Sequence, residues 1–163
     1  MKKQAYLAIG ILLIINLFIL PGYCLAEPLI PVENQVILDK GLDYFTDKQI
    51  WKPTEDDTKK ALSAIIKFLK NPKKESIRGP QNHAFQQRES KNIHNNFSNF
   101  NVQFVGIISN GKRRIYCNFF PSREEDNWKK HLVIMLDGGF WYWQIEYDIE
   151  TGKCLNFVSN GYA

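Results

Sequence analysis

The dipeptide Asn110-Gly111 stands between two runs of β-branched and aromatic residues. Both positions of a two-residue type I′ turn need positive φ angles, which Asn and Gly adopt readily, so the pattern predicts a tight antiparallel hairpin. A turn of this length pairs Ser109 with Lys112, and hence Phe104 with Cys117. The sequence therefore predicts a hairpin together with its register, which any fold of this chain must contain.

This register divides the hairpin residues between the two faces of a sheet. One face collects Val102, Phe104, Ile108, Ile115, Cys117 and Phe119. The opposite face includes Gln103, Arg114, Tyr116 and Asn118. We expect the first, more apolar face to form the core.

A second hairpin is predicted next, with strands at 131–136 and 140–148 and a turn at Gly138-Gly139. Its core face would carry Leu132, Ile134, Leu136, Trp141, Trp143 and Ile145. The same register places His131 opposite Glu146, but a three-residue turn would turn the second strand over. We interpret that pair as a cross-strand surface ion pair rather than an acid–base or metal pair.

A final strand is expected at 154–159, after a turn through Glu150–Lys153. Leu155 and Phe157 would then face the core. Cys154 would face away from it unless a β-bulge intervenes.

Residues 54–71 have the pattern of an amphipathic helix. Thr54 is a suitable N-cap, and the three acidic residues that follow it oppose the positive end of the helix dipole. The apolar residues recur at helical spacing: Ala61, Leu62, Ile65, Phe68 and Leu69. Asn71-Pro72 ends the pattern.

The remaining segments lack a sustained period. Residues 27–52 are expected to form an extended arm with one short strand, and residues 72–99 a polar loop that is either mobile or part of a contact surface. Residues 27–163 then form a single α+β domain, with one long helix on an antiparallel meander of about five strands between residues 100 and 159. In element order this resembles a cystatin-like or nuclear-transport-factor-like sheet.

The N-terminus is laid out as a secretory signal peptide, residues 1–26, with a basic start, an apolar run to Leu20 and a small-residue end at Ala26. Cleavage there leaves a chain that begins at Glu27 and removes half of the formal charge of +4. Two alternatives stay open: a lipoprotein acylated at Cys24, although the bulky Tyr23 precedes it, and an uncleaved N-terminal anchor, although Pro21-Gly22 cuts the apolar run short. We expect a periplasmic or secreted protein that meets a membrane only through this segment before cleavage.

Export into an oxidising compartment would allow one disulfide between Cys117 and Cys154. The alternative is two separate thiols, because the expected register puts them on opposite faces. The two cysteines that remain after cleavage and the three scattered histidines lack the close spacing of a zinc site, so no metal and no cofactor is predicted.

Short motifs are spread from Trp51 to the C-terminus. They are Trp51-x-Pro53-Thr54, Phe100-x-x-Gln103-Phe104-x-Gly106, the strand from Gly111-Lys112-Arg113-Arg114 to Asn118-Phe119-Phe120, Trp128, Asp137-Gly138-Gly139, Tyr147-Asp148 and Asn160-Gly161-x-Ala163. In these motifs the chain resembles a family of small exported bacterial proteins of unknown function. The resemblance implies export and an intact fold, and it implies no activity and no site residues.

The best candidates for binding are aromatic. Phe140 and Tyr142 alternate with the expected core tryptophans and could stack on a sugar or a partner protein. Tyr116 and Arg114, on the polar face of the first hairpin, are further binding candidates. The standard catalytic signatures, phosphate-binding glycine loops and paired-cysteine motifs are absent from the sequence.

The sequence therefore favours an exported, non-catalytic binding or interaction module for a protein, small-molecule or glycan partner. The mild charge argues against nucleic acid as a partner. The alternatives are a small exported enzyme that uses the carboxylates of Asp137 and Glu146, and a membrane-tethered structural protein. Alanine at Asp137 or Glu146 would abolish catalysis, whereas alanine at Tyr142 would abolish stacking.

Overall fold

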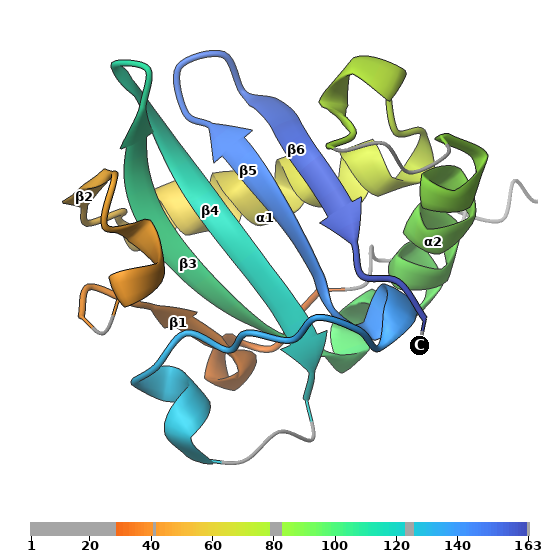
Figure 1. The fold of residues 1–163 in the computed structure, drawn as a ribbon, viewed down its shortest axis with the longest axis horizontal. Helices are drawn as coiled ribbons and strands as arrows, with labels where there is room; N and C mark the ends of the chain where they lie inside the picture. The colour runs from red at the N-terminus through yellow and green to blue at the C-terminus, as the bar shows by residue number, and fades with distance from the viewer. Residues whose placement is uncertain (1–28, 41, 79–82, 123–125, 163) are drawn as a thin grey trace, which may run out of the picture.

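The computed structural model describes residues 29–40, 42–78, 83–122 and 126–162 (Figure 1). The signal peptide expected at 1–26 lies outside the described residues. Within them the chain forms two α-helices, α1 (Glu55–Lys70) and α2 (His83–Asn95), besides short 3-10 turns. Its six strands are β1 (Gln35–Ile37), β2 (Gln49–Trp51), β3 (Phe100–Ser109), β4 (Lys112–Pro121), β5 (Trp143–Asp148) and β6 (Lys153–Ser159). The α+β class expected from the sequence is confirmed.

The sheet has the order β1-β3-β4-β5-β6, with β2 also paired to β3. All neighbours are antiparallel except β1, which runs parallel to β3 and pairs Gln35 with Val102. The predicted register of the first hairpin is confirmed, since Ser109 pairs with Lys112 and Phe104 with Cys117. Asn110 and Gly111 both have positive φ angles, as a type I′ turn requires.

Helix α1 lies across one face of the sheet, which we call the inner face, and the strands cross in front of it in Figure 1. The Thr54 side chain accepts a hydrogen bond from the Asp57 amide, and the Asp57 carboxylate accepts one from the Thr54 amide, so the predicted N-cap is a full capping box. The hydrogen bonds from Thr54 lower the pKa of Asp57 below its ordinary value. The helix buries its apolar stripe against the sheet, as predicted.

An aromatic cluster completes the core on the inner face. The Phe119 and Trp143 rings are stacked with their centroids 3.7 Å apart, and Phe97, Phe100 and Phe157 pack around them. The prediction that Trp143 belongs to the core is confirmed, and Trp141 packs partly buried against the same cluster.

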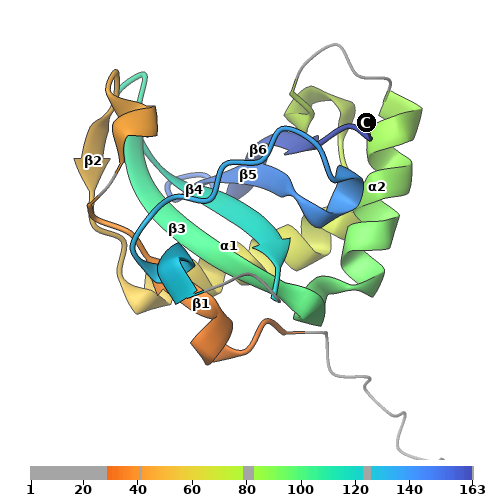
Figure 2. The ribbon, with the colours of Figure 1, turned by 60° about the horizontal axis from the view of Figure 1, so that its bottom comes forward.

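The second predicted hairpin is wrong, because residues 131–136 form no strand. Strand β5 instead pairs directly with β4, with Cys117 opposite Ile145. Residues 127–138, which we call the crossing segment, pass over the opposite, outer face of the sheet; the segment starts in a short 3-10 helix, Asp126–Lys129, and is otherwise irregular (Figures 1 and 2). Ile134 and Leu136, expected in the core, are exposed, and Gly138 and Gly139 lead into a short 3-10 turn.

Amide side chains replace strand pairing in holding the crossing segment. Gln103, Asn118 and Gln144 are directly paired residues of β3, β4 and β5, and they form a row of hydrogen-bonded amides that we call the amide ladder. The Gln103 Nε2 group donates to the carbonyls of Trp128 and His131, and Asn118 Nδ2 donates to the carbonyl of Val133 at 2.8 Å. The ladder thus satisfies backbone groups that a β-strand would have satisfied by pairing.

The N-terminal arm covers a further part of the outer face. Val105 and Ile107 of β3 are buried against Leu38 and Phe45 of the N-terminal arm. The arm contains two short strands rather than the one expected, and they both pair with β3.

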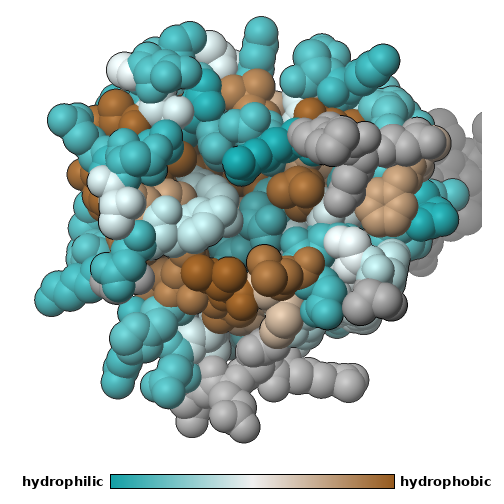
Figure 3. All heavy atoms as spheres, viewed as in Figure 1, coloured by the Kyte–Doolittle hydropathy of each residue, from teal (hydrophilic) through white to brown (hydrophobic). Residues whose placement is uncertain are grey.

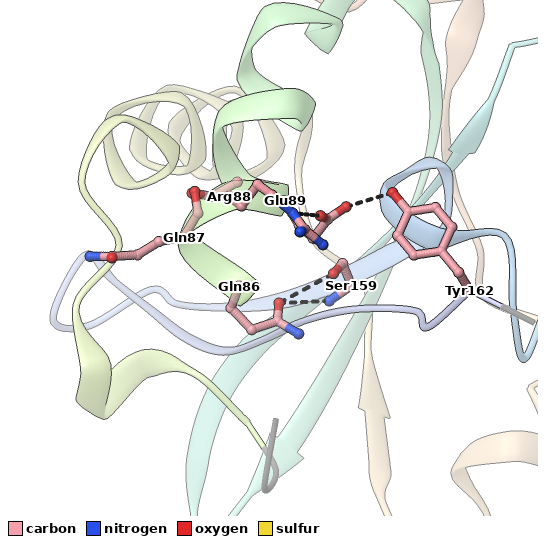
Figure 4. A network of polar contacts seen from close by, with 7 residues as sticks. Gln86, Gln87, Arg88, Glu89, Ser159 and Tyr162 are labelled. Atoms are coloured by element: carbon pink, nitrogen blue, oxygen red, sulfur yellow. Dashed lines mark hydrogen bonds and ion pairs between the residues drawn. The ribbon is translucent and has the colours of Figure 1, made fainter. Parts of the chain in front are cut away.

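Helix α2 corrects the prediction of a polar loop at 72–99. Its buried face is mostly polar, namely Gln86, Glu89, Ser90 and Ile93. Figure 4 shows how this face docks: Gln86 Oε1 accepts from the amide and hydroxyl of Ser159, while Glu89 accepts from Tyr162 Oη at 2.8 Å and from Arg88 Nε at 2.9 Å. The helix is thus fixed to the C-terminal end of β6 by hydrogen bonds.

Strand β6 contains a β-bulge, the condition under which Cys154 can face the core. The register shifts between Gln144 and Glu146, and Asn156 takes a positive φ of 53°. Because of the bulge, Cys154 and Phe157 both face the core, while Leu155 is only partly buried.

Candidate functional site

A groove of about 680 Å³ runs between β1 and α1, and we call it the β1–α1 groove. The N-terminal arm contributes Leu29, Ile30, Val32, Gln35, Val36 and Ile37 to its lining. Helix α1 contributes Glu55, Thr58, Lys59, Leu62, Ser63 and Ile66, and Phe104 comes from β3. Three segments far apart in the sequence therefore meet at this site.

One wall of the groove is a stripe of residues along one side of α1. The lining residues of α1 recur three or four positions apart, so they form one stripe along the helix beside its core-facing stripe. Leu62 and Ile66 are buried at the base of this stripe, and Lys59 and Glu55 are exposed on its rim. The groove thus has an aliphatic floor and a rim that carries charges of both signs.

The opposite wall is the edge of the sheet. Among the described residues β1 is the last strand on this side. The Leu38 amide donates to the Phe104 carbonyl at 2.9 Å, so the amide and carbonyl of the preceding residue, Ile37, point away from β3. The side chain of Gln35 is tied back to the Ile30 carbonyl at 2.8 Å, which fixes the bend at which the arm enters β1.

Aliphatic side chains extend the groove onto the surface. Leu29 is 67% exposed and Val32 is 79% exposed, and both line the groove. Exposed aliphatic residues that adjoin an apolar hollow are typical of interaction sites.

No family model, curated protein or solved structure matches this chain. The family resemblance noted from the sequence motifs therefore stays a prediction. None of the helices in the described part of the chain has the length and apolar character needed to cross a bilayer. Among the described residues, no three His, Cys, Asp or Glu side chains gather as a metal site would require.

Two of the predicted binding residues, Arg114 and Tyr116, lie on the outer face of β4 and are engaged within the protein. Arg114 Nη1 binds Glu146 Oε2 at 2.8 Å, and both side chains are mostly buried. The Tyr116 ring packs edge-on against Phe45, with centroids 5.0 Å apart. Burial raises the pKa of Tyr116 above its ordinary value, and the neighbouring Tyr44 adds to this effect.

The other two, Phe140 and Tyr142, lie beyond the start of β5. Phe140 packs against Trp141 and the inner core, with ring centroids 4.7 Å apart, so it does not share a face with Tyr142. Tyr142 borders a second cavity of about 630 Å³, together with Asn99, Pro121, Ser122, Gly138 and Trp141. The structure does not bring the four predicted residues into one site.

The carboxylates considered for catalysis are also separated. Glu146 faces Tyr116 across the β4–β5 pair and binds Arg114, whereas the Asp137 side chain is exposed on the crossing segment. His131, expected opposite Glu146, lies in the crossing segment, and its carbonyl accepts from Gln103. Asp148 is buried at the β5–β6 turn; desolvation would raise its pKa, but hydrogen bonds from Thr151 and Glu150 lower it below its ordinary value.

Cys117 and Cys154 are both buried and free. They lie on β4 and β6, opposite Ile145 and Tyr147 of the intervening β5, so their Cα atoms are two strand spacings apart, at least about 9.5 Å, with a further offset of two residues along the strand. A disulfide needs a separation below about 7 Å, so the expected bridge does not fit this sheet. Desolvation raises the pKa of Cys117 well above its ordinary value and that of Cys154 to about 12.

The outer face carries an apolar patch of its own. Figure 3 shows brown surface on this face, and the crossing segment contributes three exposed apolar residues in succession, Ile134, Met135 and Leu136.

Sequence reasoning missed the β1–α1 groove. The sequence predicts only an extended arm with one short strand at 27–52, and no local pattern shows that β1 pairs in parallel with β3. One signal was present: Glu55, Lys59, Ser63 and Ile66 recur at helical spacing on α1, next to the stripe that the sequence assigned to the core.

Proposed function

We propose that the protein is an exported, non-catalytic binding module whose ligand occupies the β1–α1 groove. The observation that carries the proposal is the groove itself, a hollow of about 680 Å³ with a floor of Ile37, Leu62, Ile66 and Phe104. Ligand pockets commonly span about 300–1,000 Å³ and combine apolar walls with a few polar groups. Here the polar groups are Thr58, Ser63, Lys59 and Glu55 along α1.

The ligand is expected to be largely apolar. Covering aliphatic surface contributes about 25 cal/mol per Å² of area removed from water, and the free protein leaves Leu29 and Val32 largely exposed. Lys59 and Glu55 then orient a ligand that carries a charged group at one end or along its length.

The aromatic outer face supports the proposal less well than the groove does. Tyr116 is packed against Phe45, and Arg114 is bound to Glu146, so a ligand there would have to compete with contacts inside the protein. An enzyme built on Asp137 and Glu146 has less support for a similar reason, because Glu146 already has its partner.

The test is a titration of the protein, expressed from its full 163-residue chain, with Nile red and with sodium dodecanoate, followed by methyl NMR. We expect either probe to shift the methyl signals of Leu62, Ile66 and Ile37 before those of Ile134 and Leu136. Shifts confined to Ile134 and Leu136 would locate binding on the outer face and contradict the proposal.

Two matched variants sharpen this test. Ser63→Trp places a ring in the mouth of the groove and should weaken probe binding at least tenfold. Lys67→Trp adds the same ring one turn farther along α1, at an exposed position outside the groove lining, and should leave binding unchanged. Equal effects of both variants would argue against the groove.

The exported location is part of the proposal and is supported by the layout of residues 1–26. We expect the protein isolated from the producing cells to begin at Glu27 and to carry no lipid, which the intact mass measures. A mass that retains Cys24 with an acyl group, or that retains the whole apolar run, would favour a lipoprotein or an anchored structural protein instead.

A further inference from the structure

We infer that the natural occupant of the β1–α1 groove is an extended segment of a partner protein, which adds to the sheet as an antiparallel strand beside β1. This inference rests on the proposed function of the groove and names the class of its ligand. Strand addition to an open sheet edge is a general mode of peptide recognition, in which main-chain hydrogen bonds give affinity and side-chain pockets give specificity.

The open edge supplies the main-chain groups. The amide and the carbonyl of Ile37 point away from β3, because the neighbouring Leu38 amide bonds to Phe104. In an antiparallel pair, one residue of the incoming strand can exchange two hydrogen bonds with a residue oriented in this way. An acyl chain or another apolar small molecule would leave both groups without a protein partner.

The groove supplies the side-chain pocket. The Ile37 side chain packs on the inner face, and directly paired residues project on the same face of a sheet. The incoming residue opposite Ile37 therefore points its side chain into the groove, toward Leu62 and Ile66. Alternate residues of the segment would be aliphatic, and those between them would face the outer side.

The rim charges suit a polypeptide that carries both signs. Glu55 and Lys59 lie one turn apart on α1 along the groove. An acidic side chain of the segment would lie beside Lys59 and a basic one beside Glu55. Reversal of one charge, Lys59→Glu, should therefore change which peptides bind.

A second copy of the protein fits the groove less well. Its own β1 could pair its backbone with Ile37, but its Ile37 side chain is already packed against its own core. The groove would stay unfilled in such a dimer. A free extended segment has its inward side chains available.

The experiment is a selection from a phage-displayed library of random decapeptides on the full-length protein, with the enriched peptides then synthesised. We expect alternating aliphatic residues in the enriched sequences. Bound peptide should slow hydrogen exchange at the Ile37 amide at least tenfold. Because that amide points away from β3, Ile37→Pro removes the outward donor without breaking the β1–β3 pairing, and it should weaken binding at least tenfold, whereas Ile37→Val should not.

A modified peptide keeps the test valid if Ile37→Pro fails to fold. N-methylation of the peptide amide that bonds to the Ile37 carbonyl should weaken binding to the unaltered protein at least tenfold. Binding that survives this modification, or no enriched peptide at all, would overturn strand addition. So would a dimer in sedimentation that Ile37→Pro dissociates, because it would assign the edge to a second copy.

These outcomes separate the two proposals. If sodium dodecanoate shifts the groove methyls while no peptide binds, strand addition is wrong and the groove remains a binding site. If neither the dodecanoate nor any peptide shifts them, the proposed function fails as well.

Discussion

At Gly106 the backbone of β3 passes beside Trp51 so closely that only a hydrogen fits. A Cβ atom there would lie 2.1 Å from the Trp51 carbonyl oxygen and 2.9 Å from the Trp51 ring. The indole is fixed in place, since its Nε1 donates to the carbonyls of Ile107 and Arg114, both at 3.2 Å. The close approach allows β2 to pair with β3 and to cover this end of the sheet.

Gly106→Ala should therefore lower the free energy of unfolding by about 1–3 kcal/mol, the usual cost of an added methyl group in a packed site. Urea denaturation measures the change. Gly161→Ala is the matched control, because nothing lies within 4 Å of a Cβ at that position, and it should have little effect. Equal stability of the two variants would contradict the close approach seen at Gly106.

The buried thiol of Cys154 makes stability depend on alkaline pH. Desolvation raises its pKa from 9.0 to about 12 in the folded protein. Between these values the unfolded chain releases the proton while the folded protein keeps it, so stability that is complete below pH 9 is lost as the pH rises toward 12.

Cys154→Ala should make the fall in unfolding free energy between pH 9 and 11 shallower by up to about 1.4 kcal/mol per pH unit. Denaturation in the presence of a reductant over this range measures the slope. Leu155→Ala, at the neighbouring position, should lower stability without changing the slope. An unchanged slope in Cys154→Ala would show that the thiol is not desolvated.

No local sequence pattern predicts the amide ladder. Its members are polar residues of strands, and their partners are backbone groups of the crossing segment. The central member, Asn118, contacts Gln103, Gln144 and Val133, whereas Gln144 makes a single bond of 3.3 Å at the end of the row.

Asn118→Ala should cost about 1–3 kcal/mol of stability, because buried donors and acceptors lose their partners. It should also speed hydrogen exchange and proteolysis across residues 128–133. Gln144→Ala should have a smaller effect on both measurements. Equal exchange rates in the two variants would argue that the crossing segment is held by its apolar contacts instead.

Helix α2 depends on polar contacts in the same way. Glu89 is fully buried, and one of its two partners is the Tyr162 hydroxyl, 2.8 Å away. Tyr162→Phe should destabilise the protein by about 1–3 kcal/mol, since it leaves a buried carboxylate with one donor fewer. Tyr44→Phe, at another exposed tyrosine, is the control. Thermal unfolding compares them, and an unchanged midpoint in Tyr162→Phe would contradict the role of this bond.

The elements that the sequence predicted correctly are those with local causes. Asn110-Gly111 determines its hairpin because the turn geometry is local, and Thr54 with Asp57 determines the start of α1 because a cap is local. Helix α2 was missed because its buried face is Gln, Glu and Ser, which gives no apolar period. The prediction of the second hairpin was wrong because the apolar alternation at 132–136 is also compatible with a segment that is not a strand. Here the backbone of the segment is bound by side-chain amides of the sheet.

At the scale of the whole molecule, the candidate site was beyond prediction because its parts meet only through tertiary structure. Residues 29–37, the rim of α1 and Phe104 form one groove after β1 pairs in parallel with β3. Of the four residues singled out in the sequence, Phe140 packs against the inner core, Arg114 and Tyr116 are engaged on the outer face, and Tyr142 borders a second cavity. Composition alone does not show where on the fold a groove of this kind will form.

The parallel pairing of β1 with β3 also sets the order in which the molecule assembles. Its partners stand about 67 positions apart in the chain, so closing this loop costs far more chain entropy than closing the Asn110-Gly111 hairpin. In pulsed hydrogen exchange during refolding, the Leu38 amide should gain protection after the amides of 113–119; simultaneous protection would contradict this order. During synthesis the N-terminal arm therefore has no strand to pair with until β3 has also been made. The groove that we propose as the partner-binding surface thus forms late in folding.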